Sequence, residues 1–132
     1  MHPLSGTIWP TPEIVAAAQL AVEDINDDPS LLPSHLLTLH IKDTKCDRDE
    51  GSKEAMQLLN EDVDALIGPA CSAVCEYVAF ISKFQGVPVV SHGCQSVGLS
   101  NIEEYPLFVR SIGSLGTTAN ALVGFLQVGY NH

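Results

Sequence analysis

Four cysteines are the residues of this sequence best suited to chemistry, and their spacing narrows what they can do. Cys71 and Cys75 lie four positions apart in the stretch GPACSAVCEY, whereas Cys46 and Cys94 stand alone. Structural zinc sites use paired C-x2-C knuckles, and redox pairs also favour C-x2-C, so this spacing matches both poorly. A cysteine nucleophile beside a histidine would lack an identifiable third group to orient the base. Two disulfides, four free thiols in a reduced core and a zinc site are the alternatives that remain.

Helices and strands that alternate along the chain must position these cysteines. Apolar residues recur at helical spacing over 12–26, 48–59, 72–84 and 116–130. Alternation or short apolar runs predict strands over 37–41, 63–68, 87–91 and 107–111. Asp47 and Glu50 have the spacing of a capping box at the start of the second helix. This order predicts an α/β fold, a three-layer αβα arrangement around a mostly parallel sheet.

The cysteines gather at one edge of the predicted sheet. Parallel sheets of this class place their working loops at the carboxyl ends of the strands. Here those loops are 42–47, 68–72 and 91–98. Because the first two loops are neighbours, a bridge between Cys46 and Cys71 is favoured. Cys75 begins the helix whose following strand ends near Cys94, so a second bridge between these two is favoured, with the zinc and free-thiol alternatives still open.

The composition limits the classes of function. The 132 residues suit one domain, and 45% of them are hydrophobic, which is not a disordered composition. The net charge of −10 leaves no basic face, so nucleic acid and anionic membrane surfaces are not expected as partners. No segment reaches the ~18–20 apolar residues of a membrane span, and MHPLSGTIWP lacks the features of a signal peptide. Four cysteines nevertheless favour an oxidising compartment. The cysteine count and the missing signal peptide agree if the chain is a fragment of a longer protein.

Three longer stretches carry a resemblance to a known family. DTKCDRDEGSKEAMQLL, ALIGPACSAVCEYVAFISKFQGVPVVSHGC and SNIEEYPLFVRS resemble the extracellular ligand-binding region of the natriuretic-peptide-receptor (ANF receptor) family, which is periplasmic-binding-protein-like, type I. AAAQLAVEDINDDPSLLP looks like the helix and turn that open its first lobe. The resemblance implies that residues 1–132 are a single, partial domain, a truncated first lobe.

Two branches of the family share the resemblance. GTIWP, CSAV and SNIEEYPLFVR look like GABA-B receptors of class C, whereas GPACSAVCEY together with SHGC looks more like receptor guanylate cyclases. The resemblance implies an extracellular lobe of a membrane receptor that transmits binding of a small molecule or peptide, most like the cyclases, with a GABA-B-like receptor or a non-signalling binding protein as alternatives. It implies a second lobe, a receptor dimer and a location on the extracellular face of the plasma membrane. The chain itself is not expected to be an enzyme, although a full-length parent could carry a guanylate cyclase domain.

The GABA-B resemblance implies a ligand site. It places Trp9 as an aromatic wall and Ser72 as a hydroxyl at a helix start, where a carboxylate can bind. Gln95 and Ser96 complete the expected ligand-binding set. Two positions depart from that pattern, because Gln95 replaces a ligand-binding serine and Ile112 replaces a ligand-binding histidine. Structural alternatives are a helix cap for Ser72 and loop packing for Trp9.

The bridge and its surroundings are also implied by the resemblance. The first-lobe bridge of the family maps onto Cys46 and Cys71, in agreement with the pairing favoured by the loops. Natriuretic peptide receptors hold a chloride ion near this bridge, and the amides of Ala70 and Cys71 match that position. No metal site is expected.

Overall fold

A computed structural model describes residues 11–130 as four α-helices and three short strands. In chain order they are α1 (Thr11–Asp27), α2 (Arg48–Asn60), β1 (Leu66–Ile67), α3 (Ser72–Gln85), β2 (Val89–Ser91), a 3-10 turn (Gly98–Ser100), β3 (Phe108–Arg110) and α4 (Leu115–Tyr130). The strands form a parallel sheet in the order β1-β2-β3. The α/β class expected from the sequence is therefore confirmed.

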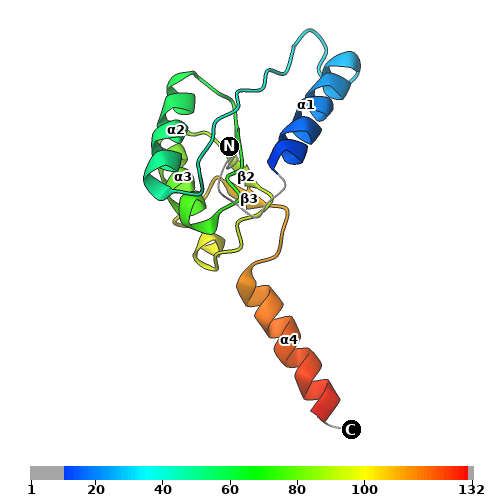
Figure 1. Ribbon diagram of the computed structural model, residues 1–132, viewed down its shortest axis with the longest axis vertical. Coiled ribbons are helices and arrows are strands. Elements are labelled where there is room, and N and C mark those ends of the chain that lie inside the picture. The colour runs from blue at the N-terminus through cyan, green and yellow to red at the C-terminus, as the bar shows by residue number, and fades with distance from the viewer. Residues whose placement is uncertain (1–10, 131–132) are drawn as a thin grey trace.

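The sheet lies between α2 and α3 on one side and α1 on the other (Figure 1). On the α2–α3 side, register neighbours Leu66 and Val89 are almost completely buried. The next register row points to the opposite face, where all three side chains are apolar and exposed: Ile67, Val90 and Val109. Parallel sheets usually have both faces covered, and here only part of the second face is covered within the described residues.

The packing of α2 on α3 supplies most of the core. The apolar positions that recur at helical spacing are buried on both helices: Ala55, Leu58, Leu59, Val74 and Val78, whereas Ile81 is only partly buried. The two helices pack closely at Gly51, where an added Cβ would lie 2.3 Å from Cγ1 of Val74. A residue without a side chain is therefore required at this crossing.

The start of α2 uses half of the expected capping box. The carboxylate of Asp47 accepts hydrogen bonds from the backbone N–H of Asp49 (3.0 Å) and of Glu50 (2.8 Å). The reciprocal bond from Glu50 is replaced by ion pairs to Lys45 (3.5 Å) and Lys53 (3.3 Å). Glu50 thus helps to tie the preceding loop to the helix.

The strand predicted over residues 37–41 is wrong. A cavity of about 300 Å³, lined by residues 36–40 and 61–67, separates this segment from β1. Since paired strands lie only ~4.8 Å apart, no ladder forms between the two segments, and the isolated bridge residue Asp43 is the only β element before α2 in the described chain. The amide of Asn26 fixes the segment instead, since it exchanges two hydrogen bonds with the backbone of Leu37 (2.7 and 3.0 Å).

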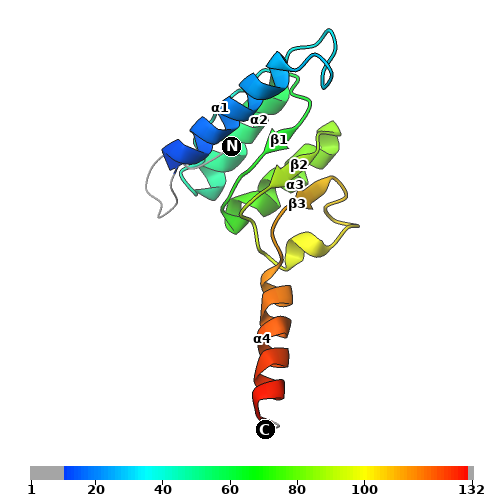
Figure 2. The same ribbon diagram turned by 90° about the vertical axis from the view of Figure 1, so that its right-hand side faces the viewer.

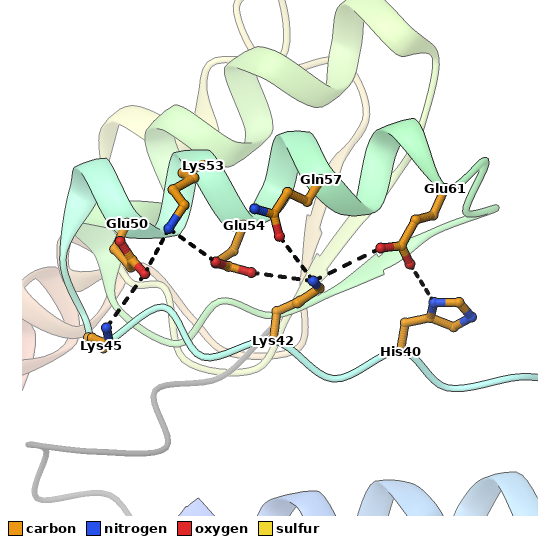
Figure 3. Close-up of polar contacts among 8 residues, drawn as sticks. All are labelled: His40, Lys42, Lys45, Glu50, Lys53, Glu54, Gln57 and Glu61. Carbon is orange, nitrogen blue, oxygen red and sulfur yellow. Dashed lines mark hydrogen bonds and ion pairs between the residues drawn. The ribbon is translucent and has the colours of Figure 1, made fainter.

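Side-chain contacts hold residues 40–45 against α2 and the residue that follows it, Glu61 (Figure 3). His40 Nδ1 lies 2.6 Å from a carboxylate oxygen of Glu61. Lys42 Nζ lies 3.0 Å from Gln57 Oε1 and 3.6 Å from Glu54. These groups are partly exposed, so each contact contributes about 0–1 kcal/mol to the stability of the fold. Together the contacts attach the segment at several points along one face of α2.

The last helix projects away from the rest of the chain (Figures 1 and 2). The sequence of α4 contains no charged residue, and large apolar side chains such as Leu122, Phe125 and Leu126 are exposed on it. Between residues 11 and 130, no helix combines the length and the apolar character needed to cross a membrane.

Candidate ligand-binding edge of the sheet

Two disulfides fasten the loops that follow β1 and β2 to neighbouring segments, one to the turn before α2 and the other to α3. They connect Cys46 to Cys71 (Cα–Cα 5.6 Å) and Cys75 to Cys94 (Cα–Cα 6.4 Å), the pairs that the loop positions favoured. The zinc and free-thiol alternatives are wrong, because all four sulfurs are used. Loops of 25 and 19 residues contribute about 3.5 and about 3.2 kcal/mol on the chain-entropy model. No group of three potential metal ligands occurs in residues 11–130.

The second bridge lies in the interior beneath this edge. Cys75 and Cys94 are both fully buried, and their sulfurs lie 3.3 and 3.2 Å from the carbonyl oxygen of Pro69. A disulfide sulfur has no hydrogen to donate, so the donor to this oxygen is the hydroxyl of Ser91, at 2.6 Å. Ser91 is itself fully buried at the end of β2.

The same hydroxyl organises the loop that follows β2. Ser91 Oγ accepts hydrogen bonds from the backbone N–H of Cys94 (3.1 Å) and, at longer range, of Gly93 (3.3 Å). The loop lies directly on Ala70, because a Cβ added at Gly93 would be 2.9 Å from the Ala70 carbonyl oxygen. The end of β2 and the loop after β1 are therefore locked together by one side chain and one close backbone approach.

Two of the predicted ligand residues meet at the start of α3. Ser72 is the first residue of α3, and its hydroxyl accepts a hydrogen bond from the backbone N–H of Gln95 at 3.0 Å. The alternative role of Ser72 as the helix cap is wrong, since Cys71 occupies the cap position. The backbone N–H groups of Ala70 and Cys71 donate no hydrogen bond to any described residue, so they stay available to an acceptor at this edge.

A third predicted residue, Ser96, is held by a network that the sequence did not suggest. Its hydroxyl is hydrogen-bonded to the carboxylate of Glu76 on α3. Arg110, on β3, donates to the carbonyl oxygens of Cys94 (3.3 Å) and Ser96 (2.8 Å) and to the hydroxyl of Ser100. The guanidinium thereby fixes the backbone on both sides of Gln95. The only signal in the sequence is an arginine at the end of a short strand.

Tyr105 packs against the cluster that contains the second bridge. Burial of its ring raises the pKa of the phenol above its ordinary value, and the charge of Glu104 adds to this effect. The hydroxyl therefore remains protonated and neutral at physiological pH.

Two further positions came from the resemblance, Trp9 as a ligand residue and Ile112 as a departure from the family pattern. Trp9 lies outside the described residues, and Ile112 is half-buried in the connection between β3 and α4. The larger cavity beside β1, described above, and a smaller one of about 80 Å³ between α1 and the sheet do not include Ser72, Gln95 or Ser96. These three residues are half-buried at the edge formed by the start of α3 and the loop after β2.

Comparison with known proteins shows which family of proteins this chain is related to. The model of the family described as "Receptor family ligand binding region" matches residues 14–131. Rice "Glutamate receptor 3.1" is 37% identical over 99 residues, which is 74% of this chain and 10% of that protein. Mouse "Gamma-aminobutyric acid type B receptor subunit 1" is 34% identical over 113 residues (84% and 12%). Drosophila melanogaster "Receptor-type guanylate cyclase Gyc76C" is 30% identical over 98 residues (74% and 6%).

The chain thus spans about a tenth of the length of the first two relatives. The match of the family model nevertheless covers most of the chain, including the edge formed by α3 and the loop after β2. The resemblance expected from the cysteine-containing motifs is confirmed. This chain belongs to the family of receptor ligand-binding regions.

Proposed function

We propose that this chain is the first lobe of the extracellular ligand-binding region of a membrane receptor, which transmits the binding of a small molecule or peptide across the membrane. The observation that carries the proposal is the convergence of Ser72, Gln95 and Ser96 on one open edge, held by two disulfides and by Arg110. In this proposal the chain binds and does not catalyse.

The chemistry of the edge favours a ligand with a carboxylate. The start of α3 provides N–H donors and the positive end of the helix dipole, and the hydroxyl of Ser72 stands beside them. The amides of Ala70 and Cys71 offer further donors, and they are also where a chloride ion is proposed. Trp9 is proposed as the aromatic wall of the same site.

The receptor works, in this proposal, through two lobes. A ligand that contacts both lobes binds the closed arrangement more tightly than the open one, and only this difference in affinity can drive a change of state. The exposed apolar side chains of α4, with no charge on the helix, support a second lobe as the covering partner, and a receptor dimer is proposed in addition.

The parent receptor is proposed to be most like the receptor guanylate cyclases, because the second bridge, Cys75–Cys94, belongs to the motif pair that resembles them. The alternative is a GABA-B-like class C receptor, favoured by the 34% identity over 113 residues. The sequence of the full transcript separates them. A single membrane span followed by a cyclase domain supports the first, and seven spans support the second.

Titration calorimetry tests the binding proposal on the chain itself. With glutamate and gamma-aminobutyric acid as probes, we expect weak saturable binding, with a Kd near ~1 mM for the better ligand, since half a cleft supplies half of the contacts. Ser72→Ala should weaken it about 3- to 10-fold through the lost hydrogen bond. Ser52→Ala is the matched control, because that hydroxyl bonds only within α2, to the Arg48 carbonyl. Micromolar binding, or equal losses in both variants, contradicts the proposal.

A further inference from the structure

The two disulfides differ sharply in their accessibility. Both cysteines of the Cys75–Cys94 bridge are fully buried between α3 and the loop after β2. In the other bridge, Cys71 is nearly buried but Cys46 is exposed, in the turn that precedes α2. The first bridge therefore reaches the surface at an exposed residue, whereas a thiolate in solution can reach the second bridge only after a local opening.

The turn that carries Cys46 is also conformationally strained. Lys45 and Cys46 are consecutive residues with positive φ, 50° and 55°. Residues with a Cβ occupy this left-handed region at a cost. Cleavage of the bridge lets this turn relax, which favours the opened form in a way that does not apply to Cys75 within α3.

The position of Cys71 favours cleavage in one direction. Cys71 is the cap residue of α3, a helix of 14 residues. The N–H groups of Val74 and Cys75 bond its carbonyl, and those of Ser72 and Ala73 have no acceptor among the described residues. A thiolate that leaves on Cys71 is stabilised by these donors and by the helix dipole, and a better-stabilised leaving thiolate departs faster.

We propose that Cys46–Cys71 is a thiol-exchange site on the surface of this lobe, and that Cys75–Cys94 is an inert structural bridge. The thiolate of a low-molecular-weight dithiol attacks the Cys46 sulfur, a mixed disulfide forms there, and the electron pair of the broken S–S bond leaves on Cys71. The second thiol of the reagent then displaces Cys46. The products are two cysteine thiols and the oxidised, cyclic reagent, so two electrons and two protons pass to the protein.

Cleavage of the Cys46–Cys71 bridge would loosen the proposed ligand-binding edge at the start of α3. The bridge ties the turn before α2 to the residue that precedes Ser72. Its reversible cleavage frees the start of α3, where Ser72 holds the backbone of Gln95. The difference in reactivity between the two bridges does not depend on the proposed ligand, so its test stands apart from the test of the receptor function.

The folded, oxidised chain is treated with dithiothreitol at neutral pH, quenched with iodoacetamide at intervals and mapped by mass spectrometry. We expect carbamidomethyl groups on Cys46 and Cys71 at least about 100-fold faster than on the other pair, because a bond exposed in one molecule per hundred reacts a hundred times more slowly. Equal rates for the two bridges, or earlier cleavage of Cys75–Cys94, overturn the proposal.

Two further measurements test the proposed direction of attack and the explanation of the rate difference from burial. With glutathione, a monothiol, we expect the trapped mixed disulfide on Cys46, and an adduct mainly on Cys71 overturns the proposed direction of attack. In ~6 M guanidinium chloride both bridges are exposed, and the rate difference should fall to a few-fold. A difference of the same size in the unfolded chain overturns the explanation from burial.

Discussion

Replacement of Ser91 by alanine should be among the most damaging conservative changes in this chain. The residue is fully buried, and its hydroxyl serves the carbonyl of Pro69 and the N–H groups of Gly93 and Cys94. Alanine leaves all three without this partner. A buried polar group that loses its partner costs about 1–3 kcal/mol. Because Pro69 and Cys94 are fully buried and the Gly93 bond is long, we expect a total loss of about 2–4 kcal/mol.

Ser82→Ala provides the matched control. Ser82 is equally buried, but its hydroxyl donates to the carbonyl of Val78, one turn earlier in the same helix (2.7 Å). That carbonyl lies inside α3, where the backbone ladder also serves it. Alanine is the better helix former by ~0.5 kcal/mol, so this variant should remain within about 0.5 kcal/mol of the parent.

Urea denaturation followed by circular dichroism measures both variants, with the disulfides verified as intact by mass spectrometry. The change in the free energy of unfolding should appear in the midpoint, with an unchanged slope. Hydrogen exchange at the Cys94 amide should accelerate in Ser91→Ala and not in Ser82→Ala. If the two variants differ by less than about 0.5 kcal/mol, the Ser91 hydroxyl does not organise this edge and the reasoning is refuted.

Three other predictions concern the same region. Gly93→Ala should destabilise the fold by about 1–3 kcal/mol, because the added methyl group would press on Ala70. Gly124→Ala is the control: its position in α4 has room for a methyl group, so this variant should be stabilised by up to ~1 kcal/mol. Thermal unfolding compares the two variants, and equal effects on stability would contradict the close approach of Gly93 to Ala70. Arg110→Lys should lose most of the hydrogen bonds that Arg110 donates to the loop over 94–100. Hydrogen exchange at the amides of this loop should then rise about tenfold. Unchanged exchange rates would show that Arg110 does not hold the loop in place. The raised pKa of Tyr105 means that the folded form retains its proton above the pKa of the unfolded chain, so stability should fall as pH rises beyond about 10. Tyr105→Phe should flatten this alkaline decline of the urea midpoint, and an identical pH profile refutes the assignment.

Most of the fold follows from local patterns in the sequence. The helices over 48–59 and 72–84 have apolar residues at helical spacing that face each other in one core, so pattern and packing agree. The short apolar runs that contain β1 and β2 are too short for helices and lie between turn residues. The segment 37–41 shows where such reasoning ends, because its alternation describes a strand but the presence of a paired neighbour decides whether one forms.

The parts of the candidate site that follow from the order of helices and strands along the chain could be predicted from the sequence. The parallel order of β1 and β2 brings the loops that carry Cys71, Ser72 and Cys94 together. Cys46 lies in the turn before α2, which follows no strand among the described residues, so its pairing was predicted correctly from a strand that does not form. The roles of Ser91 and Arg110 could not be predicted, because each depends on a contact between residues far apart in sequence. A serine or an arginine at a strand end has no local pattern that distinguishes an anchor from a solvent-exposed side chain.

Mapping of backbone amide shifts by two-dimensional NMR, during titration of the folded chain with the two amino acid probes, tests the central claim most directly. The account predicts that the largest changes fall on the amides of residues 70–73 and 93–97, and that they saturate together. Changes centred on the cavity beside β1, lined by residues 36–40 and 61–67, would contradict the assignment of the ligand-binding edge.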